Sequence, residues 1–343
     1  MTKPTIFDVA NLAGVSIKTV SRVVNRQPNV RESTRERVER AIRELHYRPD
    51  QSARNLASHS SHLIGLVYDD PAAYDMPSGG YILDLQQGAL RACRGALLEL
   101  LIHPCDYRRK EVANELQSLI NQTRVSGIVL AAPLSNIPHI VRAIEATGTP
   151  LVRLSPGSHN GGETSIVTND AEATAELTRY VAELGHTRIA YIRGDPQHQA
   201  VANRFRGYRE GLAASGLDFD ARLVANGDNS YGSGERCGQA LLELANRPTA
   251  IIAANDDMAA GVIRAAHRLG IRTPEELSVA GFDDISLARQ VDPALTTIRQ
   301  PLVRMAERAV QILVGDATDV GAKGEICIPA EIKIRESTAP APG

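Results

Sequence analysis

The chain has 343 residues, of which 43% are hydrophobic and 23% charged, and its formal net charge is −2. This composition is ordinary for a globular protein, and the length indicates two or three domains. No apolar run approaches the roughly 20 residues that a membrane span needs and no leader pattern opens the chain, so we expect a cytoplasmic protein without a membrane partner.

The charge is unevenly distributed along the chain. Residues 1–60 carry a balance of +5, and the remainder carries −7. A basic N-terminal segment on an acidic body is typical of a protein that binds a polyanion at one end. A charged face that is only solvated would give the same charge balance.

The segment that begins at residue 5 has the pattern of two short helices joined by a tight turn. Thr5 and Asp8 form the T-x-x-D pattern of a helix start, and Ser16 suits the cap of a second helix. Between them Gly14 permits a left-handed turn. This pattern predicts a helix-turn-helix.

The second of these helices has two distinct sides. Val20 and Val23 make its inner side apolar. Its outer side carries hydrogen-bond donors and no acids, and it consists of Ile17, Lys18, Ser21, Arg22 and Asn25. In a helix-turn-helix this outer side enters the major groove of DNA. A third helix is predicted where apolar residues repeat at i, i+3, i+4 and i+7, namely at Val38, Ala41, Ile42 and Leu45.

The motifs "TIFDVANLAGVSIKTVSRVVN", "STRERVERAIRELHYRPD" and "SARNLA" resemble the headpiece and hinge of the lactose-repressor/galactose-repressor (LacI/GalR) family. The resemblance implies that Ile17, Lys18 and Arg22 read bases, where Lys and Arg can donate to guanine and Ile can contact a thymine methyl. The remaining polar groups suit phosphate contacts, and these are Thr5, Ser16, Thr19, Ser21 and Asn25.

The stretch 49–61 reads as a linker that contains a marginal helix. By the same resemblance, Leu56 is the side chain that enters the minor groove at the centre of the operator. A leucine that caps a domain interface is the alternative, and we favour the minor-groove wedge.

Beyond residue 62, short apolar runs alternate with helical patterns. The expected strands are 63–68, 127–132, 150–154, 188–194, 249–255 and 277–284. The expected helices are 85–101, 111–122, 137–146, 170–184, 202–214, 234–246 and 256–269. This alternation predicts parallel sheets covered on both faces, and the number of strands favours two α/β lobes.

The predicted fold class is therefore a small all-α helix-turn-helix headpiece followed by a two-lobed α/β core that resembles periplasmic binding proteins. We expect the headpiece at 1–48 and the hinge at 49–61. The resemblance implies three crossovers, near 167, 298 and 328. The first lobe is then 62–167 with 299–327, and the second lobe is 168–298 with 328–338.

Ligands of such sheets bind beyond the carboxyl ends of the strands. The family resemblance implies that Arg204 of "NRFRGY" and Asp283 of "GFDD" hold the effector, with Asn255 beside them. Asp256 and Asp284 are expected to be helix caps. The complete predicted effector set is Asp69, Tyr81, Ser155, Arg204, Asn255 and Asp283.

Two departures from the family pattern leave the effector open. Asn229 stands where sugar-responsive members have an aromatic residue, and the chain has no Trp, so Tyr231, Phe205 or Tyr81 would have to supply a stacking ring. The long loop at 69–81 also borders the expected cleft. We expect a sugar or sugar derivative, and the alternative is a nucleobase that acts as a corepressor.

Two other classes of protein are less consistent with the sequence. The enzyme motifs HExxH, G-x-S-x-G and GxxxxGK[ST] are absent, and the nine His and four Cys are scattered, so we expect no catalytic residue, cofactor or metal. The missing leader and the fused headpiece argue against a transport receptor. After the last predicted strand no leucine heptad follows. We therefore expect a homodimer, joined through the first lobe, on a pseudo-palindromic DNA operator.

Overall fold

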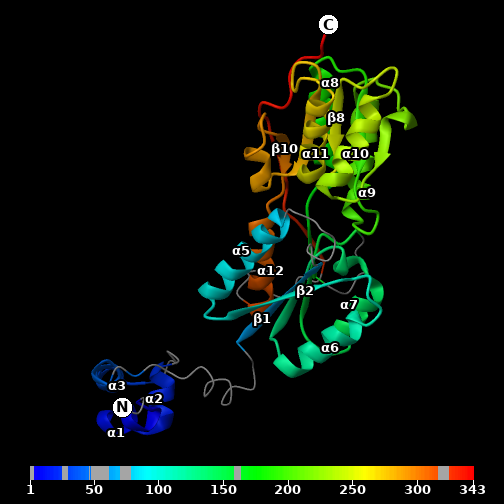
Figure 1. Ribbon diagram of the computed structural model, residues 1–343. Coiled ribbons are helices and arrows are strands. Elements are labelled where there is room, and N and C mark those ends of the chain that lie inside the picture. The colour runs from blue at the N-terminus through cyan, green and yellow to red at the C-terminus, as the bar shows by residue number, and fades with distance from the viewer. Residues whose placement is uncertain are drawn as a thin grey trace. The chain divides into compact units, whose positions relative to one another are not determined.

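The computed structural model describes residues 4–24, 30–45, 47, 62–69, 79–157, 164–315 and 324–343. The chain divides into two compact units, Met1–Ser61 and His62–Gly343, and Figure 1 labels many of their helices and strands. The predicted hinge, with Leu56, and the predicted DNA contact Asn25 lie outside the described residues. Within the described ranges, no helix is both long and apolar enough to cross a bilayer.

The described part of the first unit consists of three short helices. These are α1 (Ile6–Ala13), α2 (Ile17–Val24) and α3 (Glu32–Glu44). Their inward side chains form one small core, whose buried members are Val9, Ala10, Ala13, Val20, Val23, Val38 and Ala41. The predicted third helix and the apolar inner side of α2 are confirmed.

Local signals fix the ends of the first two helices. The Thr5 backbone N–H donates to the Asp8 carboxylate over 2.7 Å, as predicted for a capping box. Gly14 ends α1 with a φ of 60°, the left-handed conformation expected there. The Ser16 hydroxyl accepts a hydrogen bond from the Thr19 N–H over 3.2 Å and so caps α2, as predicted.

The first lobe of the second unit is built on a parallel sheet with the strand order β11-β5-β4-β3-β1-β2. Its strands are β1 (Leu63–Asp69), β2 (Glu99–Cys105), β3 (Gly127–Leu130), β4 (Leu151–Leu154), β5 (Thr164–Val167) and β11 (Glu325–Cys327). Two pairs of helices pack on it, α5 (Gly80–Gly95) with α12 (Leu302–Val314), and α6 (Val112–Thr123) with α7 (Pro138–Glu145).

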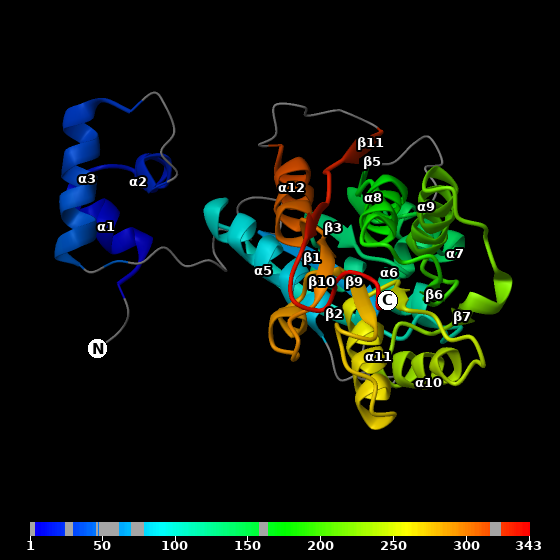
Figure 2. The same ribbon diagram turned by 90° about the horizontal axis from the view of Figure 1, so that it is seen from above.

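The second lobe is built on a sheet with the order β12-β10-β9-β8-β6-β7, in which only the β10–β12 pair is antiparallel among the described strands. Its strands are β6 (Ile189–Arg193), β7 (Val224–Asn226), β8 (Ala250–Ala253), β9 (Ser278–Asp283), β10 (Thr296–Arg299) and β12 (Glu331–Lys333). Its helices are α8 (Asp170–Glu183), α9 (Ala200–Ala214), α10 (Tyr231–Leu242) and α11 (Asp256–Arg268). In Figure 2, β6 and β9 lie between the α8–α9 pair and the α10–α11 pair.

Burial explains why these strands read as unbroken apolar runs. Every residue of β3, β8 and β9 is buried, because helices cover both faces of each sheet. The predicted two-lobed α/β core with parallel sheets is confirmed.

The chain passes between the lobes at three places. It leaves the first sheet after β5 to enter α8, returns after β10 to enter α12, and leaves again between β11 and β12. The Asn169 side chain joins two of these crossovers, because its Oδ1 accepts a hydrogen bond from the Ala330 N–H over 2.8 Å. The residues at which separate domains begin and end stay a prediction.

The predicted helix over 85–101 is wrong at its C-terminal end. α5 ends at Gly95, the chain reverses through Leu97 with a φ of 57°, and β2 starts at Glu99. β2 is an edge strand in which exposed and covered positions mix, with Ile102 43% exposed. Such a strand lacks the uniform apolar character of its buried neighbours, so its sequence resembles an amphipathic helix.

Candidate functional site

The outer face of α2 presents hydrogen-bond donors to solvent. Ile17, Lys18 and Arg22 are exposed, Thr19 and Ser21 are half-buried, and α2 contains no acidic residue. Arg and Lys can donate to the edges of bases, while hydroxyls suit phosphate oxygens. The face can therefore contact a duplex, and the role of each of these side chains in DNA binding stays a prediction.

Two of the predicted phosphate contacts already stabilise the ends of helices. The Thr5 hydroxyl donates to Asp8 Oδ2 over 2.7 Å, and Ser16 Oγ lies 2.9 Å from Thr19 Oγ1. The hydrogen bonds that the Thr5 hydroxyl and the Thr5 backbone N–H donate to Asp8 hold the pKa of its carboxyl below the usual value. Both residues thus have a structural role that sequence reasoning assigned together with the DNA contact.

A cavity of about 430 Å³ lies between the two lobes, at the carboxyl ends of their strands. The first lobe contributes Asp69, Tyr81, Ile82, Tyr107, Arg108, Ala132 and Ser155 to its wall. The second lobe contributes Asp195, His198, Ala200, Val201, Arg204, Asp228, Asn229, Ser230, Asn255, Asp257 and Asp283. All six residues predicted to bind the effector therefore line one cavity, and their binding role stays a prediction.

Arg204, on α9, is held by partners from three other segments. Its Nε donates to Asp170 Oδ1 over 2.8 Å and its guanidinium also donates to the Ala254 carbonyl over 2.6 Å. The guanidinium carbon lies 3.7 Å from the centre of the Phe282 ring. An arginine fixed in this way presents its remaining N–H groups to a ligand in a defined direction.

Asp283 stands at the end of β9 with its carboxylate between Arg204 and a crossover residue. Its Oδ1 lies 3.5 Å from the Arg204 guanidinium and accepts a hydrogen bond from Gln300 Nε2 over 2.6 Å. Burial raises the pKa of Asp283 to about 6, although the Arg204 charge acts in the opposite direction.

Asn255 shapes the wall of the cavity from the start of α11. Its Oδ1 accepts a hydrogen bond from the Met258 N–H over 3.0 Å, which makes it the N-cap of that helix. Its Nδ2 donates to the Asn229 carbonyl over 2.8 Å. The amide thus links the β8–α11 connection to the loop after β7.

Three residues of the wall have a backbone that non-glycine residues rarely adopt. Ser155, Asn229 and Asp283 have φ values of 48°, 70° and 117°. Such conformations persist only where the surroundings enforce them, and they concentrate at functional sites. The strain supports a functional role for this cavity.

The rings of the cavity are only partly those expected. Tyr81 lines the wall, whereas Phe205 packs against the Tyr191 and Tyr208 rings in the core of the second lobe, and Tyr231 is not among the lining residues. Tyr107 supplies a second ring. Burial raises the pKa of both Tyr81 and Tyr107 to about 12, so both hydroxyls remain protonated at neutral pH.

Sequence reasoning missed Tyr107 and Arg108, which follow β2. Once β2 is recognised as a strand, the rule that ligands bind at the carboxyl ends of strands identifies both. Tyr107 also bridges the two lobes, because its hydroxyl donates to Asp195 Oδ2 over 3.3 Å. His198, a further missed residue, has its pKa lowered to about 4 by burial, so its imidazole is neutral at pH 7.

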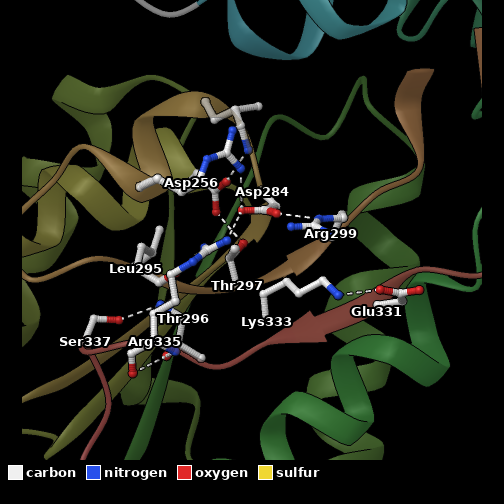
Figure 3. Close-up of polar contacts among 12 residues, drawn as sticks. Asp256, Asp284, Leu295, Thr296, Thr297, Arg299, Glu331, Lys333, Arg335 and Ser337 are labelled. Atoms are coloured by element: carbon white, nitrogen blue, oxygen red, sulfur yellow. Dashed lines mark hydrogen bonds and ion pairs between the residues drawn. The ribbon is translucent and has the colours of Figure 1, made fainter. Parts of the chain in front are cut away.

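The expectation that Asp256 and Asp284 are helix caps is wrong. Asp256 is fully buried and accepts hydrogen bonds from the Thr297 hydroxyl and the Ile285 N–H. The Asp284 carboxylate accepts from Arg299 and Arg335, each over 2.6 Å, as the dashed lines in Figure 3 trace. The two acids therefore join strands and the C-terminal segment rather than cap helices.

Comparisons with known proteins agree with both halves of this description. Residues 5–50 match the family described as bacterial regulatory proteins, lacI family, and residues 178–338 match the periplasmic binding protein-like domain. The HTH-type transcriptional regulator DegA of Bacillus subtilis is 32% identical over 341 residues, which cover 98% of this chain and 99% of that protein.

Solved structures extend the likeness over the whole chain. A lac repressor dimer bound to operator and an anti-inducer superposes with a TM-score of 0.81 at 27% identity, covering 98% of this chain and all of that one. The complex of the transcriptional regulator CelR with cellobiose gives 0.73 at 28% identity, covering 97% and 99%. Together with the helix-turn-helix and the interlobe cavity, these matches mean that the chain belongs to the LacI family of DNA-binding transcriptional regulators.

Proposed function

We propose that this protein is a homodimeric repressor that binds a pseudo-palindromic operator and is controlled by a neutral sugar in the interlobe cavity. The observation that carries the proposal is the convergence of Asp69, Tyr81, Ser155, Arg204, Asn255 and Asp283 on one cavity in a chain with a LacI-type headpiece.

The headpiece supports sequence-specific DNA binding. Lys18 and Arg22 are exposed on α2, from which they can donate to guanine O6 and N7, while Ile17 can contact a thymine methyl. Thr19 and Ser21 lie on the same short helix, and Asn25 follows it, so all three suit phosphates. Leu56 is proposed to part the central base step, as the family resemblance implies.

Dimerisation through the first lobe is supported by apolar side chains that this lobe exposes. Leu83 and Leu90 of α5, Leu97 of the turn after it and Ile102 of β2 are each at least 38% exposed. Exposed apolar residues on neighbouring elements are typical of an interface between subunits. The solved lac repressor structure is that of a dimer on its operator.

The chemistry of the cavity favours a ligand that donates hydrogen bonds and carries no negative charge. Five carboxylates line the wall against two arginines, and the carboxylates are Asp69, Asp195, Asp228, Asp257 and Asp283. Carboxylates accept hydrogen bonds from sugar hydroxyls, and tyrosine rings can pack on the apolar face of a sugar ring. A phosphate group would meet repulsion from the same wall.

A thermal-shift panel tests the effector class. D-glucose, D-galactose, D-ribose, cellobiose, D-glucose 6-phosphate and hypoxanthine are added to the full chain, and each compound that raises the melting temperature is then added to a gel shift with selected duplex DNA. A neutral sugar at one hundred times its Kd should stabilise the fold by about 2.7 kcal/mol. Stabilisation by hypoxanthine alone would favour the nucleobase alternative, and stabilisation by the phosphate ester would contradict the charge argument.

Replacing Arg22 with alanine should weaken operator binding by about 1–3 kcal/mol, because one bidentate contact to a base is lost. The variant should also discriminate less at a single base pair of each half-site. Competition gel shifts with single-base operator variants measure both effects. Arg37→Ala, on α3, is the matched control, and an equal loss in both variants would indicate a phosphate contact at Arg22.

Sugar affinity should fall by about tenfold between pH 7 and pH 5, because Asp283 then gains a proton. Burial places the pKa of Asp283 at about 6, so the carboxylate that accepts sugar hydroxyls is present above that pH and lost below it. Titration calorimetry across this range measures the profile. Asp283→Asn should remove the pH dependence, and a profile that is equally steep in this variant would assign the titration to another group.

A further inference from the structure

Gln300 occupies the second crossover between the lobes. It follows β10 of the second lobe and comes two residues before α12. That helix packs against α5, β3 and β4 of the first lobe. Gln300 is 5% exposed. A displacement of this residue would therefore move the start of a helix that belongs to the other lobe.

Two hydrogen bonds tie Gln300 to the wall of the cavity. Its backbone N–H donates to the Asp283 carbonyl over 3.2 Å, and its Nε2 donates to Asp283 Oδ1 over 2.6 Å. The same Oδ1 lies 3.5 Å from the Arg204 guanidinium. One carboxylate oxygen is thus shared between the cavity and the crossover.

The amide oxygen of Gln300 has no such partner. Gln300 Oε1 is buried and makes no hydrogen bond within the described part of the chain. A buried acceptor without a partner is unfavourable, so an arrangement of the amide in which Oε1 accepted a hydrogen bond would remove that cost. The amide is therefore held in its present position by Asp283.

Asp284, the residue after Asp283, is anchored by other partners. The Asp284 side chain is fully buried, and its carboxylate pairs with Arg289 of the 3-10 helix η4 (Ser286–Arg289), Arg299 of β10 and Arg335. Figure 3 shows Arg299 and Arg335 reaching Asp284 from two segments. Asp284 therefore holds strands of the second lobe together, whereas Asp283 faces the cavity.

We propose that Gln300 is the positioning residue through which occupancy of the cavity reaches the first lobe, an inference that rests on the proposed role of Asp283 in binding a sugar. Sugar hydroxyls that bind the Asp283 carboxylate compete with the Gln300 amide for Oδ1. The amide then shifts to an arrangement that satisfies Oε1, and residues 300–301 carry the shift to the start of α12.

The test measures operator affinity of the full chain with and without sugar, by fluorescence anisotropy on a duplex selected from random sequences. D-glucose, D-galactose, D-ribose and cellobiose are each used at saturation. Coupling in the wild type should change operator affinity roughly 5–150-fold, and in Gln300→Met this change should fall below about twofold. Sugar affinity of the variant should remain within about tenfold of the wild type, and operator affinity without sugar should be retained.

Gln117→Met is the matched control. It removes one amide hydrogen bond, from Gln117 Nε2 to the Ala143 carbonyl over 3.0 Å, at a site in the first lobe far along the chain from the crossover. This variant should keep the full response. Gln300→Leu, which also removes the donor and adds no charge, should behave like Gln300→Met and replaces it if the methionine variant melts early.

Three outcomes separate the possible failures. A wild-type response in both Gln300 variants overturns the inference and leaves the proposed function intact. Loss of sugar binding in those variants also overturns it, because Gln300 would then belong to the binding site. If none of the four sugars binds the wild type, the proposed effector class fails, and the inference fails with it.

Discussion

Replacing Arg204 with methionine should lower the free energy of unfolding by about 3–5 kcal/mol, because a buried ion pair then loses one partner. The Arg204 and Asp170 side chains are 9% and 5% exposed, so the remaining carboxylate would stay buried without its counter-charge. Methionine keeps an unbranched stem over the Phe282 ring, which limits the loss of packing. Sugar should no longer shift the melting temperature.

Urea denaturation followed by circular dichroism measures the loss, and tyrosine fluorescence gives a second probe because the chain contains nine Tyr and no Trp. The double variant Arg204→Met/Asp170→Asn is the control. It removes one of the two carboxylates that lose their counter-charge, the other being Asp283, and should recover part of the stability while the sugar response stays absent. A single variant as stable as the wild type would contradict the role given to this ion pair.

Replacing Asp284 with asparagine should lower the free energy of unfolding by about 3 kcal/mol, because the Arg335 guanidinium loses a fully buried partner. Arg335 is 15% exposed, whereas Arg299 and Arg289 are about half exposed, so solvent screens their share. Each kcal/mol of lost stability lowers the melting temperature of a domain of this size by about 2–4 °C, so the melting temperature should fall by roughly 10 °C. The shift produced by a bound sugar should persist.

Asp283→Asn, one residue earlier, is the matched comparison and should give the opposite result. Burial raises the pKa of Asp283 to about 6, so the carboxyl holds its proton more tightly in the folded chain than in the unfolded one. Its ionised form therefore destabilises the fold above about pH 6, and a neutral amide removes that cost. The variant should melt no earlier than the wild type, and a bound sugar should shift its melting temperature less at pH 7. Equal destabilisation by the two substitutions would contradict the division of roles.

The structure confirmed those predictions that rest on short-range signals. The start of α1, the turn at Gly14 and the cap of α2 by Ser16 each depend on residues within three positions of one another. The strands β3 and β8 could be predicted from their sequence. Helices cover both faces of their sheets, so every residue of these strands is buried and the strands are continuous apolar runs. The six predicted effector residues line one cavity, although Arg204 and Asp283 were predicted from the family resemblance and the binding role of all six stays a prediction.

The failures came from pairings between residues distant in the sequence. Asp256 was taken for a cap, but its partner Thr297 is 41 residues away, and the Arg335 partner of Asp284 is 51 residues beyond it. The edge strand β2 was missed because most of its residues are only partly buried or exposed, so they do not form an apolar run. Tyr107, which follows β2, was missed for the same reason. Each error concerns a contact that exists only once the chain has folded.

The sequence by itself determined the three headpiece helices, the strand–helix alternation and the family, because capping, turn and burial patterns are written in residues close together along the chain. Tertiary structure alone decided which acid faces the cavity, which rings line it, and how the crossovers are held. The physical reason is that a carboxylate is a cap, a ligand contact or an ion-pair partner according to the groups around it, and here those groups come from strands and tails that only folding brings together.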